Sequence, residues 1–261
     1  MNKTFYFNVY KALISADLKV FKQSLLDKCI DVGIWVILTV VVTGYVMQHF
    51  GLARDFGPFQ FAGIIAAIGL FELYGNAVEL VSDFEGDRVI NYNLTLPIPS
   101  WLAITSKASF YFIVYCILTL IMFPLGKICL WNQLDLAQIN YFKFTLILIA
   151  QNIFYACFLL WAASIIANMA KLGSIWARYI FPMWFMGGFQ FSQFALLNAI
   201  PCLAYINFLN PMIYITEGAR AAMLGQTGYI NFWLCFIATL AFASLALALG
   251  MRNLKKRLDF V

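Results

Sequence analysis

The chain has 261 residues, of which 63% are hydrophobic and only 11% are charged, and its formal net charge is +5. Soluble domains carry about 25% charged residues, so most of this surface cannot face water. Several apolar runs reach the roughly 20 residues that cross a ~30 Å hydrocarbon core, and their length excludes a barrel of short, alternating strands. The composition therefore predicts an all-α, multi-pass membrane protein.

The positive charge does not indicate a nucleic-acid partner, because the basic residues follow the loops between apolar runs instead of gathering on one soluble face. Six cysteines are scattered along the chain, and their spacing supports neither a disulfide framework nor a zinc site. The first 28 residues lack the apolar core of a cleavable signal peptide. We therefore expect a membrane protein that binds lipid but no nucleic acid and no metal.

Residues 1–28 precede the first long apolar run and predict an amphipathic helix. Apolar side chains recur at spacings of three and four, for example at Tyr10, Ile14 and Leu18, which places them on one helical face. Such a helix can lie along the membrane surface, or it can pack on the rest of the protein. We favour the interfacial position because the first span begins directly afterwards.

Six spans are expected after this helix, within a single domain that covers residues 1–261. They are placed at 30–49, 57–81, 108–130, 142–168, 174–197 and 229–250. An even number of spans returns the C-terminus to the side of the N-terminus. That side holds all of the 17 basic residues except Arg54, Lys127, Lys143 and Arg220. The positive-inside rule therefore predicts that both termini and the 82–107 loop are cytoplasmic.

A polar stripe lies within the expected second span, where Glu72, Asn76 and Glu79 are spaced by four and three residues. A carboxylate in hydrocarbon is costly, so Glu72 should face the bundle interior or a water-filled vestibule. There it would contact substrate or a proton together with Asn76. The alternative is that both glutamates lie near the cytoplasmic end of the span, where water reaches them, and for Glu79 we favour that alternative.

The expected fifth span is rich in aromatic side chains and contains Gly187-Gly188, which allows a kink or a close helix contact. Its rings could line a path for a hydrophobic substrate, although packing against other helices or lipid would use the same residues. The residues that we assign to such a path, with Glu72 and Asn76, are Phe181, Trp184, Phe185 and Phe189.

Residues 198–228 are half apolar, but their apolar runs are too short to span a membrane. They predict an outer re-entrant segment, which is tolerated only where protein or a cavity surrounds it. Asn210 is a suitable N-cap for a helix with Pro211 in its first turn. Glu217 and Arg220, three residues apart, can pair on one face of that helix.

The sequence contains no phosphate-binding loop of the form G-x-x-x-x-G-K-[ST], and its one histidine cannot form a catalytic triad or a zinc cluster. If the chain performs work, the energy must therefore come from another subunit. That subunit would bind the longest polar interruption, residues 82–107, which contains Asp83, Glu85, Asp87 and Arg88.

The order of these features resembles the ABC-2 type permeases, the membrane subunits of ABC exporters, over essentially the whole chain. Two stretches carry the resemblance: NLTLPIPSWLAITSK at the entry to the expected third span, and LNPMIYITEGARAAMLG at 209–225. The first is similar to the family's LP-to-Lys entry, and the second to its NP…E-x-x-R…LG pattern.

The resemblance implies two permeases, as a homodimer or a pseudo-dimer, each docked on a separate subunit that binds ATP and Mg²⁺. Residues 83–96 would form the coupling helix that enters the ATPase. The substrate path would lie near the dimer interface, between the second and fifth spans. We expect export of a hydrophobic or amphiphilic substrate across a bacterial inner membrane, with no catalysis by this chain. The alternatives are a lipid-acting membrane enzyme, with Glu72 or Glu217 as general acid or base, and a passive channel.

Overall fold

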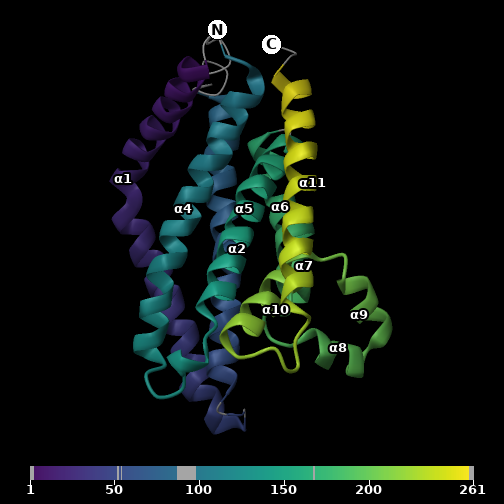
Figure 1. Ribbon diagram of the computed structural model, residues 1–261. Helices are drawn as coiled ribbons and strands as arrows, with labels where there is room; N and C mark the ends of the chain where they lie inside the picture. Colours follow the sequence, from purple (N-terminus) through teal and green to yellow (C-terminus); the bar gives the residue numbers. More distant parts are fainter. Residues whose placement is uncertain (1–2, 52, 54, 87–97, 167, 259–261) are drawn as a thin grey trace.

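The computed structural model describes residues 3–51, 53, 55–86, 98–166 and 168–258. All the regular elements in these ranges are helices, and the long ones run side by side along one axis (Figure 1). Helices satisfy their backbone hydrogen bonds within the segment, which is the condition for placing apolar runs in lipid. The prediction of an all-helical membrane protein is confirmed.

Five helices in the described part of the chain are long and apolar enough to cross a membrane, where six were predicted. The first is α1 (Lys3–Val41), which continues through a π-helical turn, η1 (Val42–Val46), and a 3₁₀ turn, η2 (Met47–Phe50). The others are α2 (Phe56–Glu85), α4 (Ser100–Cys129), α5 (Tyr141–Ile165) and α11 (Phe232–Leu258). α11 packs mainly on α5, and α1 packs mainly on α4.

The predicted fifth span, 174–197, is not one helix. Its first half is a continuous helical segment made of α6 (Leu172–Ile175), η5 (Trp176–Ile180) and α7 (Phe181–Met186), which follows the short turn η4 (Met169–Lys171). This segment is about 22 Å long at about 1.5 Å per residue, which is shorter than a ~30 Å hydrocarbon core.

The interruption occurs at Gly188, whose φ of 73° is a left-handed conformation that side chains with a Cβ rarely adopt. The carbonyl of Gly187, which would otherwise stay in a helical ladder, accepts a hydrogen bond from the Thr216 hydroxyl at 2.7 Å. The chain resumes as α8 (Gln193–Ala199), where the side chain of Ser192 caps the new helix. The Gly187 carbonyl therefore bonds with Thr216 instead of with the helix, and the expected span is divided into two helical segments.

No break separates the expected interfacial helix from the first span, because α1 runs without interruption from Lys3 to Val41. The interfacial position of residues 1–28 stays a prediction. The sequence contains no proline near residue 29, and Gly33 lies within the helix without ending it. The first half of α1 packs on α4 instead of standing apart. Lys107 pairs with Asp17 at 2.8 Å, and the Tyr10 hydroxyl hydrogen bonds with Ser109.

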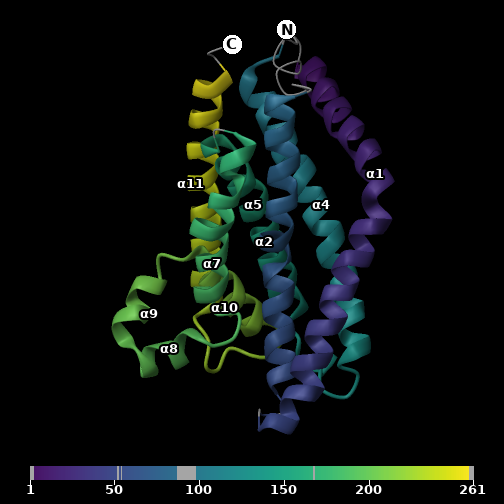
Figure 2. The same cartoon turned by 180° about the vertical axis from the view of Figure 1, so that it is seen from behind.

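The start of α1 and the end of α11 lie at the same end of the bundle in both views (Figures 1 and 2). The segment α6–α7 carries the chain toward the other end, where α8, α9 (Pro201–Asn207) and α10 (Pro211–Met223) lie. α11 then returns. The C-terminus therefore lies at the same end of the bundle as the N-terminus, as predicted. The fifth crossing between the two ends is made by the half-length segment α6–α7.

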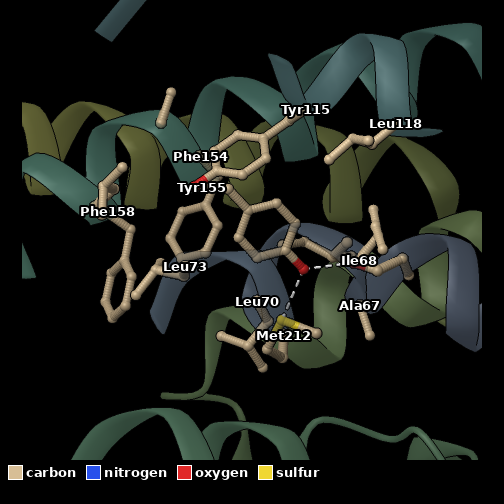
Figure 3. Close-up of a cluster of buried hydrophobic side chains, with 14 of the residues drawn as sticks. Ala67, Ile68, Leu70, Leu73, Tyr115, Leu118, Phe154, Tyr155, Phe158 and Met212 are labelled. Carbon is tan, nitrogen blue, oxygen red and sulfur yellow. Dashed lines mark hydrogen bonds between the residues drawn. The ribbon is translucent and has the colours of Figure 1, made fainter. Parts of the chain in front are cut away.

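The core lies where α2, α4, α5 and α10 meet. Figure 3 shows Tyr155 reaching from α5 over α2, and its hydroxyl donates to the carbonyl of Ala66 and to Met212 Sδ of α10 at 3.0 Å. A Cβ on Gly69 would collide with the Tyr155 ring, so glycine is required for this close approach of α5 to α2. This contact fixes the position of α10 inside the protein.

Candidate functional site

Four aromatic residues predicted to line a substrate path come together with two that were not predicted. Phe71 of α2 packs between Trp35 of α1, at 4.6 Å between ring centroids, and Trp184 of α7, at 5.6 Å. Trp184 in turn contacts the rings of Phe181, Phe185 and Phe189. We call this group of six rings the aromatic surface: Trp35, Phe71, Phe181, Trp184, Phe185 and Phe189.

The aromatic surface has an open part and a buried part. Phe181 and Phe185 are 43% and 47% exposed, whereas Phe189 is only 5% exposed. The indole N–H of Trp184 is buried and has no acceptor among the described residues. The surface can therefore offer large apolar contact area to a molecule that lies against it.

The predicted polar stripe on α2 is ion-paired with a lysine of α1. Lys28 Nζ lies 3.3 Å from Glu72 Oε2 and donates to Asn76 Oδ1 at 2.9 Å. The Asn76 amide donates onward to the Tyr115 hydroxyl of α4 at 3.1 Å, and Glu79 lies 4.0 Å from Lys28. Glu72 and Lys28 remain partly exposed, at 19% and 18% of their side-chain areas. The cluster links three helices and is still reachable by water.

Asn210 caps α10 and Pro211 occupies its first turn, as predicted, and the Asn210 carboxamide also donates to the Met183 carbonyl of α7 at 3.0 Å. The segment 198–228 contains α9 and α10, and α10 is enclosed by α2, α5 and α11. α10 is thus surrounded by protein, whereas α9 exposes Tyr205 and Ile206. The re-entrant position of residues 198–228 in a membrane stays a prediction.

Glu217 and Arg220 form the predicted pair, with 3.7 Å between Glu217 Oε1 and Arg220 Nη1, and both side chains are fully buried. The carboxylate accepts hydrogen bonds from the backbone N–H groups of Gln193 and Ile230, each at 3.1 Å. It therefore joins the start of α8 to the segment before α11. A carboxylate held by one cation and two N–H groups is well satisfied in a low-dielectric interior.

Arg220 uses its remaining donors on three backbone carbonyls. Nη2 donates to Phe189 at 3.0 Å, Nη1 to Phe191 at 3.1 Å and Nε to Phe59 at 3.3 Å. The guanidinium also lies 3.5 Å from the centre of the Phe59 ring. Arg220 thus holds the chain that follows α7 against the start of α2, and so it positions the end of the aromatic surface.

The predicted coupling residues are described only in part. Asp83 and Glu85 lie in the last turn of α2, and Glu85 Oε1 accepts a hydrogen bond from the backbone N–H of Met169 at 3.2 Å. Glu85 therefore ties the end of α2 to the turn between α5 and α6. Asp87 and Arg88, with most of the predicted helix 83–96, lie outside the described residues.

Sequence reasoning missed Lys28, Trp35 and Phe71. Lys28 was counted only as a topology signal, and the two aromatic residues sit in apolar runs where any ring looks like packing. A weak signal was present in α1, because Lys28 and Trp35 are seven residues apart and so lie on the same helical face.

The arrangement combines a half-open aromatic surface with carboxylates that are held in ion pairs. No curated protein matches the chain. The family model described as "ABC-2 type transporter" matches residues 10–224, which is most of the chain and includes α10 with both members of its buried ion pair. The chain therefore belongs to the ABC-2 type transporter family, and it is a multi-pass membrane permease subunit.

Proposed function

We propose that two copies of this chain assemble with ATP-binding subunits into an exporter for hydrophobic or amphiphilic molecules. In this arrangement ATP and Mg²⁺ bind the partner subunits, and ATP binding draws those subunits together. The movement reaches the permease through the α2–α4 connection. The end of the bundle that holds both termini also carries most of the basic residues. This supports a cytoplasmic position for both termini in a bacterial inner membrane.

The observation that carries the proposal is the open part of the aromatic surface. Phe181 and Phe185 are exposed, and Phe71 of the same surface directly precedes Glu72, which pairs with Lys28. A second copy that faced this surface would enclose a path with aromatic walls and a charged pair near one end. Such a path suits a molecule with a large apolar part and a polar part.

Transport by the assembled complex tests the role of the aromatic surface. Phe181→Ala and Phe185→Ala should each lower the rate of substrate-dependent ATP hydrolysis several-fold in proteoliposomes, because each removes exposed contact area without disturbing the core. Phe142→Ala, which removes a ring that is 68% exposed on α5, is the matched control. Equal rates in all three variants would contradict the assignment of the path.

The partner is tested separately by co-purification. Reversing the charges of Asp87 and Arg88 should release the ATP-binding subunit, whereas Asn132→Lys at the opposite end of the bundle should not. Replacement of residues 83–96 by glycine and serine should abolish the complex. If the full complex and its activity were retained after that replacement, the proposal would be contradicted.

A lipid-acting enzyme is less well supported, because both of its candidate acids are ion-paired. Glu72 contacts Lys28, and Glu217 is fully buried against Arg220. Product formation from lipid by the purified chain, without ATP or a partner, would revive that alternative. Ion flux through liposomes that contain the chain alone would favour a passive channel.

A further inference from the structure

A hollow that the proposed transport path does not use lies between α1, α2 and α4. It has a volume of about 310 Å³, at the lower end of the range of small-molecule sites, about 300–1,000 Å³. Its walls come from the first half of α1, the last turns of α2 and the first turns of α4, toward the end of the bundle that holds both termini (Figure 1). We call it the three-helix cavity, and its polar lining consists of Asp17, Ser24, Glu79, Asp83, Lys107 and Tyr111.

The wall of the three-helix cavity already holds one primary ammonium group. Lys107 Nζ lies 2.8 Å from Asp17 Oδ1 and 5.9 Å from the centre of the Phe110 ring. The carboxylate supplies the counter-charge and the ring supplies a cation–π contact, and protein sites for ammonium ions use both. Three carboxylates line the cavity beside this single lysine, so the cavity favours a second cation.

Glu79 and Tyr111 provide acceptors for such a cation. The Glu79 side chain is 63% exposed, and its contact with Lys28 is long, at 4.0 Å. Tyr111 is only 4% exposed, and its hydroxyl makes no hydrogen bond with any described residue. Buried polar groups in proteins nearly always have a partner. A buried hydroxyl that lines a cavity and has no partner in the described part of the chain therefore leaves a hydrogen bond for a ligand.

The other lining residues favour an organic cation over a metal ion. Although three carboxylates line the cavity, no group of three acidic, histidine or cysteine side chains in the described ranges is close enough to hold a metal ion. Rings form part of the wall instead. Phe21 and Phe110 meet edge to face at 6.2 Å between centroids, and Phe110 packs on Tyr111 at 4.9 Å. Aromatic rings attract organic ammonium ions, whereas hard metal ions take oxygen ligands.

We propose that the three-helix cavity binds a primary ammonium group. Its N–H groups donate to the Glu79 carboxylate and the Tyr111 hydroxyl, and its carbon chain lies against the rings. A quaternary ammonium group would use the same rings, but it has no N–H group for the two acceptors. The ammonium belongs either to a free amine or to the headgroup of an aminophospholipid. A lipid can reach the cavity because Val20 on its wall is 70% exposed on the outer face of the bundle.

Binding at this site does not rest on the proposed function. The three-helix cavity shares no residue with the aromatic surface, and an ammonium group in it needs neither ATP nor a partner subunit. An ammonium group held there joins α1 to α2 and α4, beside the α2–α4 connection. The site is therefore placed to stabilise one arrangement of these three helices.

Saturation-transfer NMR tests the site on the whole chain in nanodiscs of phosphatidylcholine, which carries no primary amine. Ethanolamine should receive saturation from the protein, and choline should receive none. Glu79→Gln and Tyr111→Phe should each weaken ethanolamine binding by about fivefold, through the loss of one hydrogen bond. Tyr111→Phe keeps the buried ring, so the packing of α4 is preserved. Asp31→Asn removes an exposed carboxylate of α1 outside the cavity, and this matched control for Glu79→Gln should change nothing.

Three results would overturn the proposal: absence of saturation on ethanolamine, equal saturation of choline, or equal ethanolamine binding in the wild type and in either variant. Nanodiscs that contain phosphatidylethanolamine distinguish the two sources of the ammonium group. Displacement of ethanolamine by this lipid identifies the headgroup, and equal ethanolamine binding in both kinds of nanodisc identifies a free amine; either result supports the cavity as the site. Loss of transport in the complex with intact ethanolamine binding would count against the proposed function only.

Discussion

Replacement of Arg220 by methionine should destabilise the protein by about 4 kcal/mol, because removing one member of a buried ion pair typically costs 3–5 kcal/mol. The change leaves the Glu217 carboxylate buried without its cation, and it removes the donors for the carbonyls of Phe59, Phe189 and Phe191. A chain of this size loses about 2–4 °C in Tm per kcal/mol, so the expected fall is about 10 °C.

Thermal unfolding in detergent, followed by tryptophan fluorescence, measures this effect. Arg178→Met removes an exposed arginine from η5 and is the matched control, with an expected change within about 0.5 kcal/mol. The double variant Glu217→Gln/Arg220→Met should recover part of the loss, since it leaves no buried charge. A Tm for Arg220→Met within about 2 °C of the wild type would refute the reasoning.

Two further predictions concern helix contacts. Lys28→Met should lower the free energy of unfolding by about 2 kcal/mol, because it removes a charged hydrogen-bond partner. Glu72→Gln in the same chain should restore part of the lost stability, and absence of this rescue would contradict the pairing. Gly69→Ala should destabilise by about 1–3 kcal/mol through its collision with Tyr155, whereas Gly75→Ala in the same helix, with nothing within 4 Å, should stabilise by up to about 1 kcal/mol. Thermal unfolding separates the two glycines, and equal effects would contradict the close packing.

Local signals in the sequence were sufficient for α10. Asn210 and Pro211 mark the start of a helix through their own side-chain chemistry, and the spacing of Glu217 and Arg220 places them on one face. None of these inferences needs a distant part of the chain. The burial of the pair was not predictable, because it depends on the carbonyl of Phe59, which lies 161 residues away in sequence.

The errors have the same physical origin. Gly187-Gly188 indicated a kink, but a full interruption depends on Thr216 of α10 taking the carbonyl of Gly187. The pairing of Glu72 was not predictable, because its partner, Lys28, lies on another helix whose register with α2 is set by packing. A contact of Glu72 with substrate stays a prediction. Hydropathy reports where a helix can enter lipid, and it does not report which neighbour will replace a hydrogen bond within it.

The enclosure of α10 has a consequence for the order in which the protein is assembled. A helix of 13 residues with a glutamate and an arginine is too short and too polar to enter a bilayer by itself. It can enter only after α2 and α5 have formed the surfaces that receive it, and α11 then closes over it. We therefore expect assembly to finish with the docking of α10 and the closure of α11 over it. The hydrogen bonds of Arg220 to the carbonyls of Phe59, Phe189 and Phe191, which join the start of α2 to the chain after α7, form only at this final step.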